Sequence, residues 1–242
     1  MIVLFTDFGL EGPYVGQVKA VLWAEAPAQP VIDLFADAPD RRPREAAYLL
    51  AAFAAAFPAN SVFLGVVDPG VGGARPGVAL RLDGHWFVGP GNGLFELVTR
   101  RSAHIETYVI APAAGPVSAS FHGRDVFAPV AGRLAAGRPP AAAGLRPGSV
   151  PRFAEWPDDL AAVIYVDRYG NLMTGLRADR VSAERRLAIG GRRLRAANTF
   201  SDVARGEAFW YPNANGLVEI AVNDGNAASV FAATIGMPVE IV

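Results

Sequence analysis

The first half of the chain alternates short apolar runs with segments whose apolar residues recur every three or four positions. Apolar runs of four to eight residues are typical of buried strands, and the longer periodic segments are typical of helices. We therefore expect strands at residues 2–5, 30–35 and 61–69 and helices at residues 14–26 and 43–57. This alternation favours a largely parallel sheet with helices on its faces.

The pattern changes after residue 77, where residues 78–89 predict a β-hairpin that turns at Asp83-Gly84. A short helix over residues 94–101, a strand over 104–110 and a helix over 124–137 follow it. The first half is therefore expected to be α/β with some antiparallel addition.

Residues 138–157 concentrate proline and glycine as linkers do, so we place a boundary near residue 150. Beyond it, short β-rich runs are joined by turns that contain glycine and asparagine; they cover residues 161–176, 186–200 and 207–222. A closing helix over 227–236 and a strand over 238–242 complete the chain. The pattern predicts an α/β domain at residues 1–150 and an antiparallel β domain at residues 151–242.

Composition narrows the class of protein. Hydrophobic residues make up 52% of the 242 residues, enough for a substantial core, and the net charge of −1 lacks the basic excess that nucleic-acid binding requires. The absence of cysteine excludes disulfides and thiolate chemistry. The longest apolar run, residues 46–57, is too short to span a membrane, and the first residues do not resemble a signal peptide. We expect a cytoplasmic protein that binds neither nucleic acid nor membrane.

Two acidic residues, Asp7 and Asp68, each follow a predicted strand. In open α/β sheets ligands bind beyond the carboxyl ends of the strands, although a single aspartate there caps the next element or starts a turn at least as often. Arg75 follows Asp68 after a run of glycines that permits a tight turn. An arginine returned to Asp68 would orient that carboxylate, whereas an isolated Arg75 would be an ordinary loop residue.

His122 lies in the segment SFHGRD, just before a predicted helix, and could accept or relay a proton from water. Together, Asp68, Arg75 and His122 would hold one water molecule against an electrophilic carbon. A metal site built from Asp7, Asp68, His122 and Asp125 is an alternative, but no HxH or HExxH spacing supports it. We interpret His85 and His104 as structural.

Polar residues in the second half gather at strand ends, in residues 167–171 and 211–226. Their amides and free backbone groups could bind a purine edge or an amino-acid zwitterion, and ordinary hairpin turns explain them equally well. The glycine-rich segment 89–93 matches neither a dinucleotide-binding nor a P-loop spacing, so we interpret it as a turn.

Taken together, these motifs resemble the S-adenosylmethionine hydroxide adenosyltransferases, which are related to the fluorinase and chlorinase. The matching motifs are TDFG at 6–9, YVG at 14–16, VVDPGVGGAR at 66–75, FHGRD at 121–125, DRYGN at 167–171 and NGLVEIAVNDGNAA at 215–228. The resemblance implies an amino-terminal α/β domain, a carboxy-terminal antiparallel β-barrel-like domain, and a homotrimer whose active sites lie between subunits.

The resemblance also implies an activity, namely hydrolysis of S-adenosyl-L-methionine at its 5′ carbon to adenosine and L-methionine, with no cofactor or metal. Asp68, Arg75 and His122 would be the water-activating set. Gly123 stands where the halogenating relatives carry a hydroxyl, which favours water over halide as the nucleophile. The alternatives are a metal-dependent hydrolase of a nucleotide-like substrate and a non-catalytic nucleoside-binding module.

By the same resemblance, the remaining site residues would bind parts of the substrate. Asp7 would bind the ribose hydroxyls, Phe121 and Phe200 would pack near the nucleoside, and the backbone around Val222 would contact adenine. Asp167 and Asn171 would hold polar groups. The chain departs from the family at residues 33–39, which lack a Ser/Thr-His pair, and at Ala214, where a serine is usual; Asn213 or Asn215 could replace that serine's contact with the methionine carboxylate.

Overall fold

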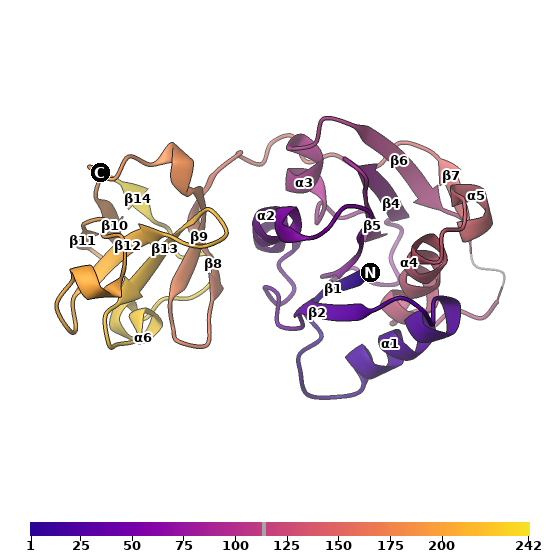
Figure 1. Ribbon diagram of the computed structural model, residues 1–242, viewed down its shortest axis with the longest axis horizontal. Helices are drawn as coiled ribbons and strands as arrows, with labels where there is room; N and C mark the ends of the chain where they lie inside the picture. The colour runs from indigo at the N-terminus through magenta and orange to yellow at the C-terminus, as the bar shows by residue number, and fades with distance from the viewer. Residues whose placement is uncertain (113–114) are drawn as a thin grey trace. The chain divides into compact units, whose positions relative to one another are not determined.

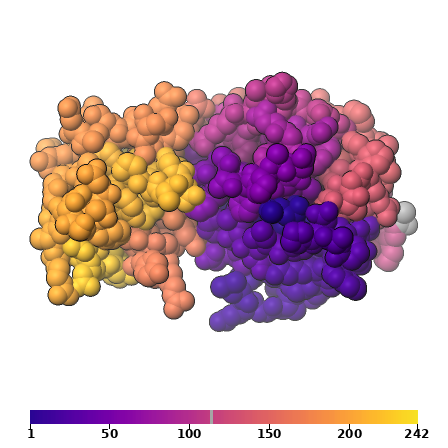
Figure 2. Space-filling view, viewed as in Figure 1, coloured from indigo at the N-terminus to yellow at the C-terminus, as the bar shows by residue number. Residues whose placement is uncertain are grey.

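The computed structural model describes residues 1–112 and 115–242, which divide into two compact units, Met1–Phe153 and Ala154–Val242. Figure 1 traces the chain through both units. Side chains fill the space between the ribbons within each unit (Figure 2).

The first unit is built on a seven-stranded sheet with the strand order β2-β1-β3-β5-β4-β6-β7. Its strands are β1 (Ile2–Thr6), β2 (Val31–Phe35), β3 (Val62–Val66), β4 (Gly77–Leu82), β5 (His85–Pro90), β6 (Ile105–Ile110) and β7 (Leu145–Pro147). The four strands β2, β1, β3 and β5 are parallel to one another, whereas β4 is antiparallel to both of its neighbours. The mixed, mostly parallel sheet confirms the predicted fold class.

Helices cover both faces of this sheet (Figure 1). On one face, α1 (Tyr14–Glu25) and α4 (Ala128–Ala135) bury Leu22 and Val130 in the same core cluster as Ile2 and Leu4 of β1. On the other face lie α2 (Pro43–Phe53), the short turn η1 (Ala54–Ala56) and α3 (Glu96–Arg100). There, ring contacts join Phe5 to Phe35 and Phe35 to Phe53. Phe5 faces this side because successive residues of a strand point to opposite faces, and its neighbour Leu4 lies in the core cluster of the first face.

The segment expected to be a linker contains regular structure. A helical turn, α5 (Pro140–Ala143), ends at Gly144, which has a φ of 91°, and β7 then pairs with β6 at the edge of the sheet. Proline is tolerated in β7 because the strand lies at an edge, where one side makes no ladder bonds. The stretch from residue 138 to 157, whose composition resembles a linker, therefore includes one helical turn and one edge strand.

The second unit is antiparallel, as predicted. A four-stranded sheet has the order β12-β13-β9-β8 and a three-stranded sheet has the order β11-β10-β14. The strands are β8 (Leu160–Val166), β9 (Leu172–Arg177), β10 (Leu187–Ile189), β11 (Arg192–Leu194), β12 (Ala208–Pro212), β13 (Leu217–Val222) and β14 (Glu240–Ile241). Single bridges, Ala162 to Pro238 and Ala196 to Trp210, join the two sheets at both edges, giving a barrel-like arrangement.

The core of the second unit is enclosed by these sheets and includes the fully buried Trp210, Val218 and Ile220. Short turns η3 (Ala178–Arg180) and η4 (Phe200–Asp202) connect the strands. The helix α6 (Ala227–Phe231) is shorter than the predicted 227–236, because Ala232 takes a left-handed conformation that ends it.

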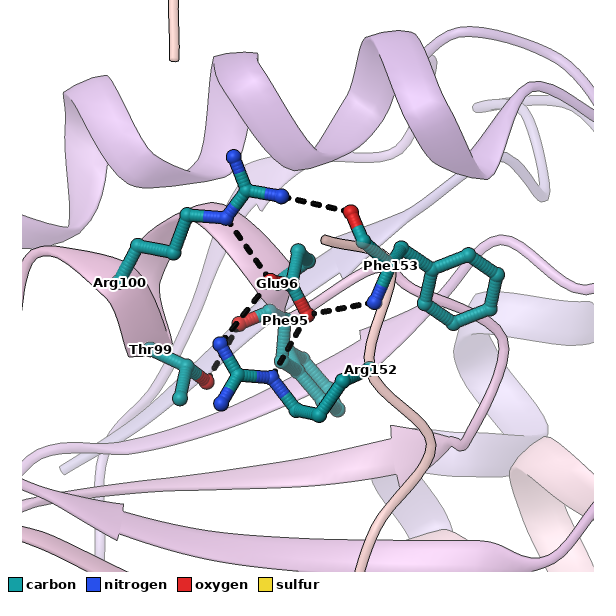
Figure 3. Close-up of polar contacts among 6 residues, drawn as sticks. All are labelled: Phe95, Glu96, Thr99, Arg100, Arg152 and Phe153. Atoms are coloured by element: carbon teal, nitrogen blue, oxygen red, sulfur yellow. Dashed lines mark hydrogen bonds and ion pairs between the residues drawn. The ribbon is translucent and has the colours of Figure 1, made fainter. Parts of the chain in front are cut away.

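The end of the first unit is held to α3 by a buried carboxylate (Figure 3). Glu96, whose side chain is 1% exposed, accepts hydrogen bonds from Arg100 (2.8 Å), Arg152 (2.9 Å) and the backbone N–H of Phe153 (3.1 Å). Arg100 in turn donates to the Phe153 carbonyl at 2.6 Å. Burial alone would raise the pKa of the Glu96 carboxyl, but these hydrogen bonds outweigh burial and lower the pKa from 4.5 to about 2.

We expect Glu96→Gln to destabilise the first unit near neutral pH, because the lowered pKa corresponds to on the order of 3 kcal/mol of stability. A carboxyl whose pKa is depressed by folding stabilises the protein above its unfolded pKa. The difference from wild type should therefore shrink as the pH falls from 4.5 towards 2. Urea unfolding across this range measures it.

The matched control is Glu106→Gln, which removes the same charge from an exposed pair, since Glu106 and Arg81 are 51% and 47% exposed. Such pairs contribute about 0–1 kcal/mol. Equal effects of the two substitutions would contradict the role assigned to burial at Glu96.

Candidate functional site

Asp7 and Asp68 meet at one edge of the parallel sheet. Strands β1 and β3 are neighbours, Asp7 directly follows β1, and Asp68 lies two residues beyond β3. The backbone N–H of Asp7 donates to the Val66 carbonyl at 3.3 Å. The structure thus brings together the two strand-end acids that the sequence singled out.

A glycine turn returns Arg75 to Asp68. Arg75 Nε donates to Asp68 Oδ1 at 2.8 Å and Nη2 donates to Oδ2, giving a bidentate pair whose side chains are 13% and 4% exposed. Gly72 has a φ of 79°, and a Cβ there would lie 2.5 Å from the Ala119 carbonyl oxygen. Only glycine allows this turn to approach the segment that leads to His122.

His122 joins the pair from the start of a π-helical turn, η2 (Gly123–Phe127), which leads into α4. Its Nδ1 lies 3.4 Å from Arg75 Nη2, and the Phe127 ring packs against both side chains. Arginine can only donate, so this contact is a hydrogen bond when Nδ1 acts as the acceptor. π-helical turns recur at functional sites, and this one continues as the predicted helix.

The acids and His122 line a pocket of about 90 Å³. Its lining residues are Asp7, Phe8, Arg41, Val66, Asp68, Val71, Ser120, Phe121, His122 and Gly123. A pocket of this volume has room for a few water molecules or a small part of a larger ligand.

One wall of the pocket is aromatic. The Phe121 ring contacts the ring of Phe8 at 5.8 Å and that of Tyr14 at 5.4 Å, both edge-on. The Arg124 guanidinium lies 4.9 Å from the centre of the same Phe121 ring. Gly123 packs beneath it, because a Cβ there would lie 3.0 Å from Phe8 Cζ. A side chain at position 123 would therefore displace Phe8.

Asp7 is held in the pocket by a backbone group. Its Oδ2 accepts a hydrogen bond from the N–H of Arg41 at 3.0 Å. Burial raises the pKa of the Asp7 carboxyl, and the nearby Asp40 and Asp68 add to the rise, while the Arg41 hydrogen bond opposes it. Arg41 was not identified from the sequence.

Asn92 is a second residue that sequence reasoning missed. Its Nδ2 donates to the Val67 carbonyl at 2.9 Å, one residue before Asp68, and its Oδ1 accepts the Leu94 N–H at 3.3 Å. The segment 89–93 was interpreted only as a turn. In the sequence, an asparagine between two glycines only weakly indicates a side chain that holds the backbone next to Asp68.

Asp125 has a different role from Asp68. It accepts hydrogen bonds from Arg124 Nε at 2.6 Å and from the Ser118 N–H at 2.8 Å, and the Arg124 bond is the main cause of its lowered pKa. Asp125 thereby fixes the loop before His122. In residues 1–112 and 115–242, no three histidine or acidic side chains are grouped to hold a metal ion.

In the second unit, Asp167 and Asn171 form one hairpin turn between β8 and β9. Asp167 Oδ2 accepts from Asn171 Nδ2 at 2.9 Å, and Oδ1 accepts the N–H groups of Tyr169 and Asn171. Asn171 is 7% exposed. The two predicted residues are thus brought together and orient each other.

Phe200 contacts Tyr211, and Asn213 contacts Glu219. Neither Tyr211 nor Glu219 was predicted from the sequence as a site residue. Tyr211 donates its hydroxyl hydrogen to the buried Glu219, which also accepts from Asn213 Nδ2 at 2.9 Å. Burial first, and then this hydrogen bond, raise the pKa of Tyr211. The Phe200 ring lies 5.6 Å from that of Tyr211. A lone glutamate within the apolar strand LVEIAV was the available signal.

Val222 is the last residue of β13, and Asn215 lies in the turn two residues before that strand begins. The Asn215 N–H donates to Asn213 Oδ1 at 3.0 Å, so the Asn213 side chain organises the turn before the strand. Val222 is buried, and its carbonyl accepts the Gly225 N–H at 3.1 Å.

None of the helices described in the two units is both long and apolar enough to cross a membrane.

Comparison with known proteins gives consistent matches along the chain. Residues 2–144 match the family model for the SAM hydroxide adenosyltransferase N-terminal domain, and residues 161–240 match that for the C-terminal domain. An (R)-S-adenosyl-L-methionine hydrolase of Thermus thermophilus is 41% identical, covering 99% of this chain and 98% of the relative. One from Salinispora arenicola is 37% identical, covering 96% and 93%.

More distant similarity reaches a fluorinase of Nocardia brasiliensis, 24% identical and covering 100% of this chain and 96% of that protein. Among solved structures, a conserved protein from Thermotoga maritima superposes with a TM-score of 0.88 at 32% identity, covering 100% and 99% of the two chains. The similarity therefore extends over both units.

Proposed function

The chain belongs to the SAM hydroxide adenosyltransferase family, and on that premise we propose that it hydrolyses (R)-S-adenosyl-L-methionine at the 5′ carbon, giving adenosine and L-methionine. The observation that carries the proposal is the constellation of Asp68, Arg75 and His122 beside a pocket with room for water. These three residues would hold the attacking water.

The chemistry asks little of the protein beyond alignment. The oxygen of water forms a bond to the 5′ carbon, the carbon–sulfur bond breaks, and sulfur keeps the electron pair as neutral methionine. The sulfonium needs no acid to help it leave. The protein has only to place a desolvated water in line with that bond and accept its proton, which fixed hydrogen bonds can do.

In the first unit, Asp7 would bind the ribose hydroxyls and Phe121 would pack against the nucleoside. Gly123 contributes no hydroxyl to the pocket, and the charged carboxylate of Asp68 lines it. Both features favour water over a halide anion as the nucleophile, because a carboxylate repels an anion and accepts hydrogen bonds from water.

In the second unit, Asp167, Asn171, Asn213 and Asn215 would bind polar groups of the substrate, Phe200 would pack near the nucleoside, and the backbone around Val222 would contact adenine. The pocket of about 90 Å³ is smaller than the several hundred Å³ that enclose a ligand of this size. This supports a site that is completed by residues of a neighbouring subunit, in a homotrimer whose active sites lie between subunits. We further propose a cytoplasmic location and no cofactor.

Incubation of the purified protein with S-adenosyl-L-methionine tests this function. We expect adenosine and methionine to form in equal amounts, in large excess over enzyme, and with no loss on addition of a chelator. Loss of activity with chelator would instead indicate a metal-dependent hydrolase, and stoichiometric binding without turnover would indicate a nucleoside-binding module. A halogenated nucleoside formed with chloride or fluoride would contradict water as the nucleophile.

A further inference from the structure

Arg41 has a backbone conformation that L-amino acids rarely adopt. Its φ is 54°, in the left-handed region, and it occupies the third position of a turn closed by the Arg42 N–H and the Pro39 carbonyl at 3.1 Å. Glycine is usual at such a position, and a residue with a side chain is strained there. Strain of this kind persists where the surrounding structure or a function requires it.

The strained turn places one backbone N–H, that of Arg41, against Asp7 in the pocket. The Arg41 N–H donates to Asp7 Oδ2 at 3.0 Å. The turn is itself fixed to the segment after β1, because Ala38 N–H donates to the Thr6 carbonyl at 3.0 Å and Gly9 N–H donates to the Ala36 carbonyl at 2.6 Å. Three hydrogen bonds therefore hold this turn against Asp7 and its neighbours.

The Arg41 side chain does not take part in holding Asp7. It is 76% exposed and forms an ion pair with Asp40, its Nη2 lying 3.0 Å from Oδ2. The hydrogen bond that holds Asp7 is thus made by the Arg41 backbone, and its direction depends on φ rather than on the guanidinium charge.

We propose that Arg41 is a positioning residue for ribose recognition, whose left-handed backbone aims its N–H at Asp7 Oδ2 and thereby orients that carboxylate towards the vicinal hydroxyls of the substrate. The inference rests on the proposed function. The carboxylate would otherwise rotate, and its second oxygen, Oδ1, would lose its fixed direction. Loss of a hydrogen bond to a charged group lowers binding affinity by about tenfold to a hundredfold.

The test compares S-adenosyl-L-methionine with its 2′-deoxy analogue as substrates. Wild type should prefer the ribose substrate by about tenfold to a hundredfold in kcat/KM. Arg41→Gly should keep this preference, since glycine adopts positive φ without strain and retains the N–H. Arg41→Val should reduce the preference, because β-branched residues disfavour this conformation, and Arg41→Pro should abolish it, because proline lacks the N–H.

The control series is Asn60→Gly and Asn60→Val, at another residue with positive φ (65°) that does not line the pocket. These variants should leave the preference unchanged. If Arg41→Pro fails to fold, the comparison of Arg41→Gly with Arg41→Val decides.

Two results would overturn the proposal. One is an equal loss of preference in the glycine and valine variants of Arg41, which would place the effect in the side chain. The other is a wild-type enzyme that hydrolyses both substrates equally well. An inactive wild-type protein would instead overturn the proposed function, so the two failures are distinguishable.

Discussion

Turnover of S-adenosyl-L-methionine is expected to fall by about 10²–10⁴-fold in Asp68→Ala, with little change in KM. The Asp68 carboxylate lines the pocket and is held by Arg75 at 2.8 Å, so it is oriented to accept a hydrogen bond from water. Its removal takes away an interaction that matters most as the water loses its proton. Steady-state kinetics on purified protein measure both constants.

The substitution also leaves Arg75, which is 13% exposed, without its carboxylate partner. Breaking a largely buried ion pair can cost several kcal/mol, so unfolding must be followed in parallel. Asp68→Asn keeps the shape and removes the charge, and it should show the same loss of turnover. Asp33→Ala, which removes an acid from a pair that is 38% exposed, is the control. Wild-type turnover in Asp68→Asn would show that the carboxylate does not act on the water.

The second large effect is expected for His122→Ala, again about 10²–10⁴-fold in turnover. His122 lies in the pocket, with Nδ1 directed at Arg75 and its ring against Phe127. Alanine leaves a space of imidazole size, so added imidazole should restore part of the activity.

The control for this prediction is His104→Ala, since the His104 side chain is 91% exposed and does not line the pocket. It should retain full activity. If His122→Ala did so as well, histidine would have no part in activating water, and Asp68 with Arg75 would have to suffice.

The order of strands and helices in the first half could be predicted because its signals are local. The hairpin of β4 and β5 turns at Asp83-Gly84, both of which have positive φ, as the sequence indicated. By contrast, β7 was missed because it is a strand only through pairing with β6, which lies far away in the sequence. Its proline and glycine content resembles a linker until the partner strand is known.

The same distinction applies to the site. Asp7 and Asp68 could be placed together because both follow parallel strands, and strand ends converge at one edge of a sheet. The supports from Arg41 and Asn92 could not be predicted, because one is a backbone N–H set by an unusual φ and the other bonds a distant carbonyl. The contact between Tyr211 and Glu219 joins paired positions of β12 and β13, so it required the strand register.

The origin of the oxygen in the product tests the central claim most directly. We would carry out the reaction in water enriched in ¹⁸O and locate the label by mass spectrometry. Attack of water held by Asp68, Arg75 and His122 on the 5′ carbon predicts one ¹⁸O atom on the 5′ oxygen of adenosine and none in methionine. Label in homoserine or in methanol would place the attack on a different carbon of the sulfonium, and unlabelled adenosine would exclude water as the nucleophile.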